Sequence, residues 1–291
     1  MEANNLISTS KNFILYHGNC PDGFGGAYAA WKKFGENAEY IPVSHGKPAP
    51  EGLEGGNLYL IDFCYPQDLM DGLVRTAAHL VVLDHHEGIR NVVEKMPEFV
   101  FDNNRSGATI AWNYFHPDEP VPAILRYVED GDLYRFVLPE SHSILVYLYA
   151  QHRTFQNWDE LRKELDAPDG FAHILAIGRT YGEYYEILVE QIVHSAELVS
   201  FEGYECYLAS CSRAFTSDVG NKLARSKGPL ALIASVRDDG LRVSLRGDGT
   251  VDVAAIAQKY GGNGHKSAAA FAIPFGTPIP WTPLEHENPG N

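Results

Sequence analysis

The chain has 291 residues, a length that suits two domains better than one compact core. Apolar residues make up 45% of it and charged residues 21%, which is typical of a folded globular protein. The formal net charge of −15 disfavours a broad basic surface, so we expect no binding to long DNA or RNA. Such a chain can still hold a small phosphorylated substrate in a local pocket, and its carboxylates can bind cations.

No stretch approaches the roughly 18–20 uninterrupted apolar residues that a membrane helix needs. The N-terminal segment MEANNLISTSK lacks the charged-then-apolar pattern of a secretory signal. We therefore expect a cytoplasmic protein with no membrane partner. None of the four cysteines forms a C-x-x-C pair, so we expect reduced thiols and disfavour a zinc site built from these cysteines.

Short apolar segments alternate with helical segments in the first half of the chain. We expect strands at 12–17, 39–43, 57–62 and 79–84, a loop at 22–26, and helices at 27–34, from Pro66, at 106–115 and at 122–129. Strands that alternate with helices indicate a parallel sheet.

Polar residues stand where three of these strands end. His17, Asp62 and Asp84 each occupy the carboxyl end of a strand. In an open α/β sheet that edge is where ligands bind. Taken alone, each acid is better explained as a helix N-cap, which is common at strand-to-helix turns. Only together with the motifs below do these residues favour a binding site.

The second half begins with a mainly helical segment and then changes its pattern. Leu, Ile, Tyr and Ala recur at helical steps over 139–200, which predicts a connector between domains. Beyond it we expect strands at 204–209, 229–236, 241–246 and 267–273, helices at 215–226 and 253–260, and a glycine loop at 261–265. The sequence thus predicts a parallel-sheet domain at 1–138, the connector at 139–200, a smaller mixed-sheet domain at 201–278 and a tail at 279–291, with an active cleft between two α/β domains.

The segment Leu83-Asp84-His85-His86 delivers an acid and two adjacent imidazoles into one loop. Three other acidic motifs accompany it in chain order: His17 with Asp22, then Asp62, and finally Asp130-Gly131-Asp132. Carboxylates with imidazole suit Mn²⁺, and carboxylates with water suit Mg²⁺. Several carboxylates can share one site only when cations neutralise them.

These four motifs, in this order, resemble those of the DHH phosphoesterase superfamily. Its members include RecJ-like exonucleases, oligoribonucleases, phosphatases of 3′-phosphoadenosine 5′-phosphate, cyclic-dinucleotide phosphodiesterases and pyro- or polyphosphatases. The second half resembles the DHH-associated C-terminal domain through the run GGNGHKSAAA at 261–270 and through Ser244-Leu245-Arg246. The resemblance extends from about Phe13 to Phe271.

The resemblance implies a role for each matching residue. The implied metal ligands are His17, Asp22, Asp62, His85 and Asp130, with Asp62 bridging two ions. Asp84 would orient a ligand or a water, and His86 would face the substrate phosphate. Asp132 is interpreted as a nearby structural acid.

Residues of the second half would contact the substrate. Arg246 and His265, together with His86, would give hydrogen bonds or positive charge to the phosphoryl group. The backbone of Gly262, Asn263 and Gly264 could form an anion-binding nest, although a plain turn is the alternative. Arg105 either meets phosphate or caps the following helix.

One position departs from the family pattern. Many relatives carry two acids, two residues apart, in the first motif, and here Cys20 stands two residues before Asp22. A thiolate is a soft ligand that fits Mn²⁺ or Mg²⁺ poorly. We therefore expect one Mn²⁺ or Mg²⁺ site, and a second whose occupancy depends on Cys20.

The expected function is metal-dependent hydrolysis of phosphodiester bonds in short oligonucleotides or small nucleotides. The alternatives are a 3′-phosphoadenosine 5′-phosphate phosphatase, a pyro- or polyphosphatase, and a non-catalytic nucleotide-binding or sensor protein. A homodimer is compatible with the sequence.

Overall fold

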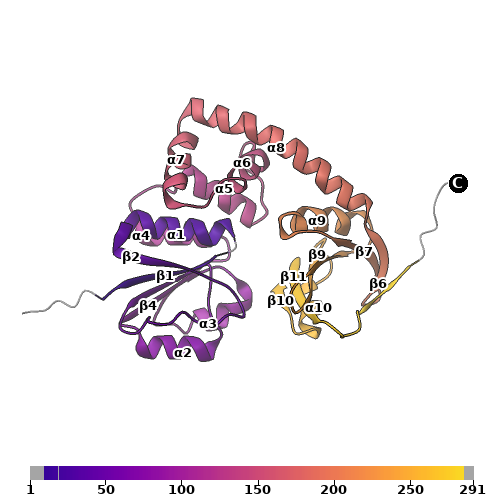
Figure 1. The fold of residues 1–291 in the computed structure, drawn as a ribbon, viewed down its shortest axis with the longest axis horizontal. Helices are drawn as coiled ribbons and strands as arrows, with labels where there is room; N and C mark the ends of the chain where they lie inside the picture. Colours follow the sequence, from indigo (N-terminus) through magenta and orange to yellow (C-terminus); the bar gives the residue numbers. More distant parts are fainter. Residues whose placement is uncertain (1–9, 19, 285–291) are drawn as a thin grey trace, which may run out of the picture. The chain divides into compact units, whose positions relative to one another are not determined.

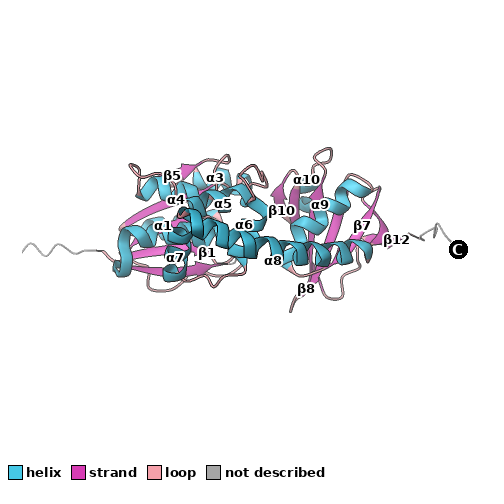
Figure 2. Cartoon of the chain, turned by 90° about the horizontal axis from the view of Figure 1, so that it is seen from above, coloured by secondary structure: helices cyan, strands magenta, loops and turns pink. Residues whose placement is uncertain are grey.

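The computed structural model describes residues 10–18 and 20–284, and the chain divides into two compact units between Gly182 and Glu183. The division falls inside the helix α8 (Pro168–His194), which continues through the segment that the sequence predicts to be a connector (Figure 2). Each unit has its own sheet and hydrophobic clusters, so the predicted architecture of two α/β domains is confirmed (Figure 1). None of the helices in the described ranges is long and apolar enough to cross a bilayer.

Five parallel strands form the sheet of the first unit, in the order β2-β1-β3-β4-β5. Their bounds are β1 Asn12–His17, β2 Ala38–Val43, β3 Asn57–Ile61, β4 His79–Asp84 and β5 Glu98–Phe101. Successive strand residues point to opposite faces. Ile14 and Tyr16 accordingly join one hydrophobic cluster, and Phe13 and Leu15 join another. The predicted parallel sheet is confirmed, with β5 as a strand that the sequence did not predict.

Helices cover both faces of this sheet, as a parallel sheet requires. The helices α1 (Pro21–Phe34) and α4 (Gly107–Phe115) lie on one face, and α2 (Gln67–Thr76) and the short α3 (Arg90–Val93) lie on the other (Figure 1). Three further helices pack into the cluster beneath α1: α5 (Ala123–Asp132), α6 (Ser141–Tyr149) and α7 (Phe155–Asp166). The segment predicted as a connector therefore starts with two helices that belong to the core of the first unit.

The segment 22–26, predicted as a loop, is instead the first part of α1. Cys20 caps this helix, since its Sγ accepts the N–H of Gly23, and Pro21 occupies the first turn. A Cβ atom at Gly23 would lie 2.3 Å from the backbone oxygen of His17. Glycine disfavours helix in isolation, but here it lets the helix approach the strand end closely, and this packing outweighs the propensity.

The second unit has a mixed seven-stranded sheet in the order β10-β11-β9-β8-β7-β6-β12. Its strands are β6 Glu197–Phe201, β7 Tyr204–Ser210, β8 Leu230–Val236, β9 Gly240–Gly247, β10 Asn263–His265, β11 Ala268–Pro274 and β12 Trp281–Pro283. The β7 and β8 strands pair in parallel, and the other neighbours are antiparallel. The helices α9 (Thr216–Ser226) and α10 (Val253–Lys259) pack into two different clusters, one against each face.

Two segments of this unit differ from their predicted state. The end of the predicted glycine loop forms β10. The start of the predicted tail forms β12, which pairs with β6 and buries Trp281. The rest of the predicted tail, 285–291, lies outside the described residues, as do residues 1–9.

Candidate metal centre

Three strands of the first unit deliver polar residues to one edge of the sheet. The β3 strand lies between β1 and β4, and the register aligns Tyr16 with Ile61 and Ile61 with Leu83. The residues that follow these three positions are His17, Asp62 and Asp84, so they stand in a row at the carboxyl edge. Their predicted convergence is confirmed.

Asp62 occupies the middle of this row in an unusual backbone conformation. Its φ is 55°, in the left-handed region, which costs a non-glycine residue about 1–2 kcal/mol. Its N–H donates to the Leu83 oxygen at 2.9 Å, which holds it to the neighbouring strand end. A Cβ atom at Gly107, the first residue of α4, would lie only 2.6 Å from the Asp62 Cβ. The sheet edge and the α4 N-terminus thus fix this carboxylate, and such strain is characteristic of functional sites.

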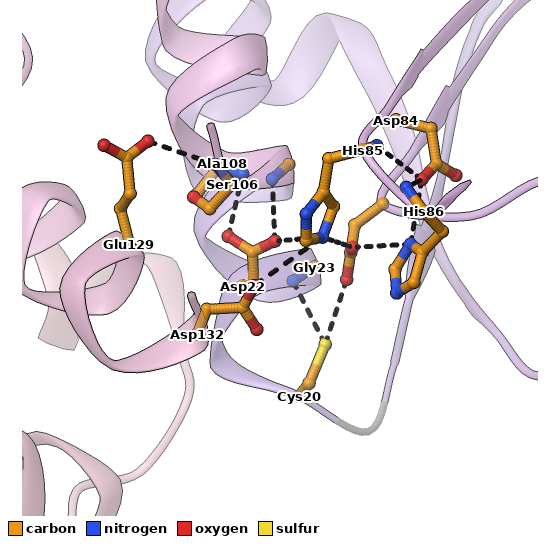
Figure 3. Close-up of polar contacts among 12 residues, drawn as sticks. Cys20, Asp22, Gly23, Asp84, His85, His86, Ser106, Ala108, Glu129 and Asp132 are labelled. Atoms are coloured by element: carbon orange, nitrogen blue, oxygen red, sulfur yellow. Dashed lines mark hydrogen bonds and ion pairs between the residues drawn. The ribbon is translucent and has the colours of Figure 1, made fainter. Parts of the chain in front are cut away.

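The two oxygens of Asp62 face two different sets of donors. Figure 3 shows Asp22, His85 and Asp132 next to one another, with Cys20 close to them. Oδ1 lies 3.2 Å from His85 Nε2, and Oδ2 lies 3.1 Å from Cys20 Sγ. Three groups of side chains have ligand atoms within 4.8 Å of one another: His17–Cys20–Asp62, Asp62–His85–His86, and Asp22–His85–Asp132. We call His17, Cys20, Asp22, Asp62, His85 and Asp132 the donor cluster.

Asp22 is held in the donor cluster by the N-terminus of α4. Its carboxylate accepts the N–H of Gly107 at 2.7 Å and that of Ala108 at 2.9 Å. These are N–H groups that a helix leaves unpaired, and the positive end of the helix dipole stabilises an anion there. The Oδ2 atom also lies 3.6 Å from His85 Nε2, so this carboxylate belongs to both the helix end and the cluster.

The fourth motif enters the cluster through Asp132 and not through Asp130. Asp132 Oδ2 lies 3.6 Å from His85 Nε2, whereas the carboxylate of Asp130 accepts the N–H groups of Val137 and Leu138 at 3.0 and 3.1 Å. The prediction that Asp130 is a metal ligand is therefore corrected. Residues two apart on a helix point in nearly opposite directions, so only one acid of this pair can face the cluster.

Asp84 hydrogen-bonds to the two histidines that follow it. Its Oδ1 atom accepts the N–H of His85 at 2.6 Å, the N–H of His86 at 2.9 Å, and a hydrogen bond with His86 Nδ1 at 2.8 Å. Burial acts to lower the pKa of His86, but the Asp84 hydrogen bond and the Asp62 charge outweigh it and raise the pKa to about 10. His86 is thus a cationic side chain, 34% exposed, beside the cluster.

The carboxylates of the cluster perturb one another because they are close together, and those of Asp22 and Asp62 are also buried. Burial, together with the charges of Asp132 and Asp62, raises the pKa of Asp22 well above its usual range. Burial also raises the pKa of Asp132 to about 6, although His85 opposes this. Burial acts in the same direction on Asp62, but the nearby imidazoles of His17 and His85 outweigh it and hold the pKa of Asp62 below its usual range. A cation bound here would displace the protons that the cluster otherwise retains.

Several buried atoms of this region suit a cation. Among the described residues, Asp62 Oδ1, Asp84 Oδ2 and His85 Nε2 are buried without a hydrogen-bond partner. Each such atom lowers the stability of the folded state by about 1–3 kcal/mol. We therefore expect a ligand from outside the protein to pair with these atoms. Carboxylate oxygen with imidazole nitrogen is a donor set for Mn²⁺, and these residues therefore fit a divalent cation.

Comparison with known proteins identifies the fold of this chain. No family model matches the chain. An uncharacterized protein of Acanthamoeba polyphaga mimivirus is 28% identical, in a match that covers 89% of this chain and 67% of that protein. The solved DHH domain of a member of a family of ribosomal proteins has a TM-score of 0.59 at 12% identity, over 90% of this chain and 82% of that one. An exopolyphosphatase-related protein from Bacteroides fragilis has a TM-score of 0.53 at 11% identity, over 93% and 89%.

This chain has the DHH fold. The resemblance of its four motifs to DHH proteins is thus confirmed at the level of the fold.

In the second unit of this DHH fold, the register brings two predicted substrate residues together. Ala268 pairs with His265 on one side and with Arg246 on the other, so all three lie on one face of the sheet. The small Ala268 side chain separates the histidine from the arginine. Arg246 donates to Ser217 Oγ at 3.1 Å, which anchors its guanidinium next to α9. We call Arg246, His265 and Ala268 the polar face of the second unit.

The predicted anion nest at 261–264 is not formed. The N–H groups of Gly261 and Gly262 donate to carbonyls of α10, at 3.0 and 2.9 Å, and that of Gly264 donates to the Asn263 side chain at 2.8 Å. The last carbonyls of a helix need such donors, and a glycine at the helix end supplies them readily. This loop ends α10, and any role of Asn263 in binding depends on its exposed side chain.

An arginine that the sequence did not predict stands beside Arg105 in the first unit. Arg105 Nη1 lies 3.2 Å and Arg135 Nη1 lies 3.7 Å from the same oxygen of Glu129. The other Glu129 oxygen accepts the N–H of Ser106 at 3.0 Å, so this buried acid ties both arginines to the start of α4. Ser106 also caps α4 as predicted, since its Oγ accepts the N–H of Thr109. The one available signal for Arg135 was its position three residues after an acid of the fourth motif.

Proposed function

We propose that this chain is a divalent-metal-dependent phosphoesterase that cleaves phosphodiester bonds in short oligonucleotides or small nucleotides. The observation that supports the proposal is the donor cluster, in which acids and imidazoles from separate segments meet around Asp62, itself 1% exposed. Carboxylates this close and this buried need positive charge to compensate them. If the cluster had only a structural role, its buried oxygen and nitrogen atoms would be expected to have hydrogen-bond partners, and some of them have none.

The residues divide into cation ligands and groups that act on the substrate. Asp22, Asp62, His85 and Asp132 would hold Mn²⁺ or Mg²⁺. When bound, the cations would activate a water molecule and neutralise the charge that develops on the phosphoryl oxygens. His86, positively charged and oriented by Asp84, would donate a hydrogen bond to a phosphoryl oxygen.

Features next to the cluster favour a nucleotide as the substrate. The Arg105 and Arg135 guanidinium groups, anchored by Glu129, suit the planar recognition of a phosphate. The loop after Asp132 exposes Tyr134 and Phe136, at 40% and 37%, with ring centroids 4.8 Å apart. Exposed aromatic rings stack with bases and gain nothing from pyrophosphate or polyphosphate.

A second candidate function is hydrolysis of 3′-phosphoadenosine 5′-phosphate. The same arginine pair favours it, because this substrate carries a second phosphate that a guanidinium pair can bind. The two candidates share the donor cluster and differ in the ester that is cleaved.

The test is Mn²⁺-dependent hydrolysis of bis(4-nitrophenyl) phosphate by the wild type and His85→Ala. We expect His85→Ala to lose more than the 10–100-fold typical of residues outside the ligand shell, so roughly 100-fold or more. His194→Ala, an exposed histidine on α8, is the matched control and should keep wild-type turnover. Equal turnover by wild type and His85→Ala would contradict the proposed site.

A substrate panel then separates the candidate functions. It contains a linear dinucleotide, 3′-phosphoadenosine 5′-phosphate, a cyclic dinucleotide and pyrophosphate, each with Mn²⁺. Fastest turnover of the linear dinucleotide supports our first choice. Nucleotide binding without turnover of any substrate would point to a sensor protein.

A further inference from the structure

One side of the donor cluster contains sulfur. We infer that His17, Cys20 and Asp62 form a thiolate-containing metal site, here called the thiol site, that selects Zn²⁺ over Mn²⁺ and Mg²⁺. The inference rests on the proposed function, because the thiol site is one part of the same cation-binding cluster. It assigns to Cys20 a role as a metal ligand that sets which ion is bound.

The distances among the three donors approach those of a tetrahedral zinc site. Cys20 Sγ lies 3.2 Å from His17 Nδ1 and 3.1 Å from Asp62 Oδ2, and the latter two atoms are 3.4 Å apart. Zinc bonds of about 2.3 Å to sulfur, about 2.0 Å to nitrogen and about 2.1 Å to oxygen, at tetrahedral angles, separate such donors by about 3.4–3.6 Å. Shifts of a few tenths of an ångström in two side chains therefore complete the geometry.

The three donors are fixed by different parts of the fold. His17 ends β1, Asp62 follows β3, and Cys20 is the N-cap of α1. The N–H of Gly23 points at the sulfur at 3.3 Å, and Cys20 lies at the N-terminus of α1. Burial and the charges of Asp62 and Asp22 raise the pKa of the Cys20 thiol well above its usual value, so a bound cation has to displace the thiol proton. The start of α1 therefore fixes the position of the sulfur next to the cluster.

The buried carboxylate of Asp62 presents one oxygen to each side of the donor cluster. Its Oδ2 atom lies 3.1 Å from Cys20 Sγ and 3.4 Å from His17 Nδ1, whereas Oδ1 lies 3.2 Å from His85 Nε2. Asp62 is 1% exposed, so solvent does not compensate its charge. The thiol site would hold one cation, and Asp22, His85 and Asp132 would hold another.

The donor chemistry differs between the two sides of Asp62. Beyond the shared carboxylate, Asp22, His85 and Asp132 offer only oxygen and nitrogen, which suit Mn²⁺. The thiol site offers sulfur, nitrogen and oxygen, a set that favours Zn²⁺ because thiolate is a soft ligand. Three protein ligands with a fourth position open to water or substrate are the pattern of catalytic zinc sites.

Cobalt substitution tests the thiol site directly, because a thiolate bound to Co²⁺ gives a charge-transfer band in the near ultraviolet. Metal-stripped full-length protein would be titrated with Co²⁺, and the band should appear in the wild type and in Cys211→Ser. It should be absent from Cys20→Ser. Cys211 is a half-buried free cysteine of the second unit and serves as the matched control.

Competition then measures selectivity. Zn²⁺ should abolish the cobalt band at a concentration at least roughly tenfold below that needed with Mn²⁺. Cys20→Asp, which provides an oxygen donor at the same position, should lose the band and bind Mn²⁺ at this side in a stoichiometry assay by mass spectrometry. This variant also covers the case in which Cys20→Ser fails to fold.

The outcomes separate this inference from the proposed function. Wild-type protein that binds Co²⁺ without a charge-transfer band overturns the thiol site, even where Mn²⁺-dependent hydrolysis persists. A thiol band in protein that hydrolyses no phosphoester overturns the proposed function alone. The absence of any Co²⁺, Zn²⁺ or Mn²⁺ binding contradicts both.

Discussion

The two units of this protein differ in whether their charged side chains are buried or exposed. Every buried carboxylate and imidazole in the described part of the chain belongs to the first unit: Asp22, Asp62, Asp84, His85, Glu129 and Asp130. The second unit keeps Arg246 half-buried and His265 exposed on the face of its sheet against which α9 packs. A buried charge is stable only with a partner, and an exposed one is available to a ligand from solvent. This difference agrees with the proposed division of roles, in which the first unit would hold cations and the second would contact a substrate.

Among the variants that test this difference between the units, Asp62→Asn in the first unit should have the largest effect. Asparagine tolerates the left-handed backbone of this position, so the fold should survive while the cations lose their shared ligand. We expect a loss of Mn²⁺-dependent hydrolysis of about 10³-fold or more and reduced metal content by mass spectrometry. Asp238→Asn, on the surface of the second unit, is the control and should change neither.

Within the first unit, the two acids of the fourth motif should respond differently to substitution. Asp132→Asn should weaken Mn²⁺ binding by about 10–100-fold with little change in Tm. Asp130→Asn should keep Mn²⁺ binding but lower Tm by about 2–4 °C, since an amide has one oxygen for the two N–H groups that the carboxylate accepts. Calorimetry on both variants checks this, and the reverse pattern would restore Asp130 as the ligand.

The polar face of the second unit should affect binding more than chemistry. We expect Arg246→Ala and His265→Ala each to raise KM for a dinucleotide by about 10-fold with kcat within a factor of about 3, because they would bind the phosphoryl group equally well in the ground state and in the transition state. Steady-state kinetics at saturating Mn²⁺ measures this split. A fall in kcat at unchanged KM would show that the second unit takes part in the chemical step.

The smallest expected effect concerns stability within the first unit. Asp159 on α7 lies 2.8 Å from Lys163 and 2.9 Å from Lys32 of α1, and it accepts the Tyr28 hydroxyl at 3.0 Å. Although burial acts to raise the pKa of Asp159, hydrogen bonds from these groups lower it below the usual range. The ionised carboxylate should therefore stabilise this unit above pH 4, and the benefit should fade as the pH falls towards the lowered pKa.

Asp159→Asn removes this contribution. Because solvent screens these ion pairs, we expect the free energy of unfolding to fall by only about 1 kcal/mol at pH 7, with the difference from the wild type shrinking below about pH 4. Urea unfolding at several pH values provides the measurement. A difference that stays constant with pH would exclude a role for the charge.

The sequence predicted those parts of the fold and site that depend on local pattern. Strands ending in His17, Asp62 and Asp84 could be recognised because parallel strands bring their carboxyl ends to one edge. The helical start of α1 could not be recognised from the sequence, because its glycines disfavour a helix until the sheet packs against them. The choice between Asp130 and Asp132 depends on how α5 is rotated against its neighbours, which a repeated Asp-Gly-Asp spacing does not encode. The position of Arg135 beside Arg105 could not be predicted for a similar reason, because Glu129 comes close to Arg135 only in the folded chain.

The central claim is that Asp62 joins side chains from separate segments around divalent cations. Anomalous diffraction from crystals soaked in Mn²⁺ tests it most directly. The account predicts a peak within about 2.0–2.3 Å of oxygen or nitrogen atoms of Asp22, Asp62, His85 and Asp132. A peak bound at Asp130, or fully loaded crystals with no peak beside Asp62, would contradict it.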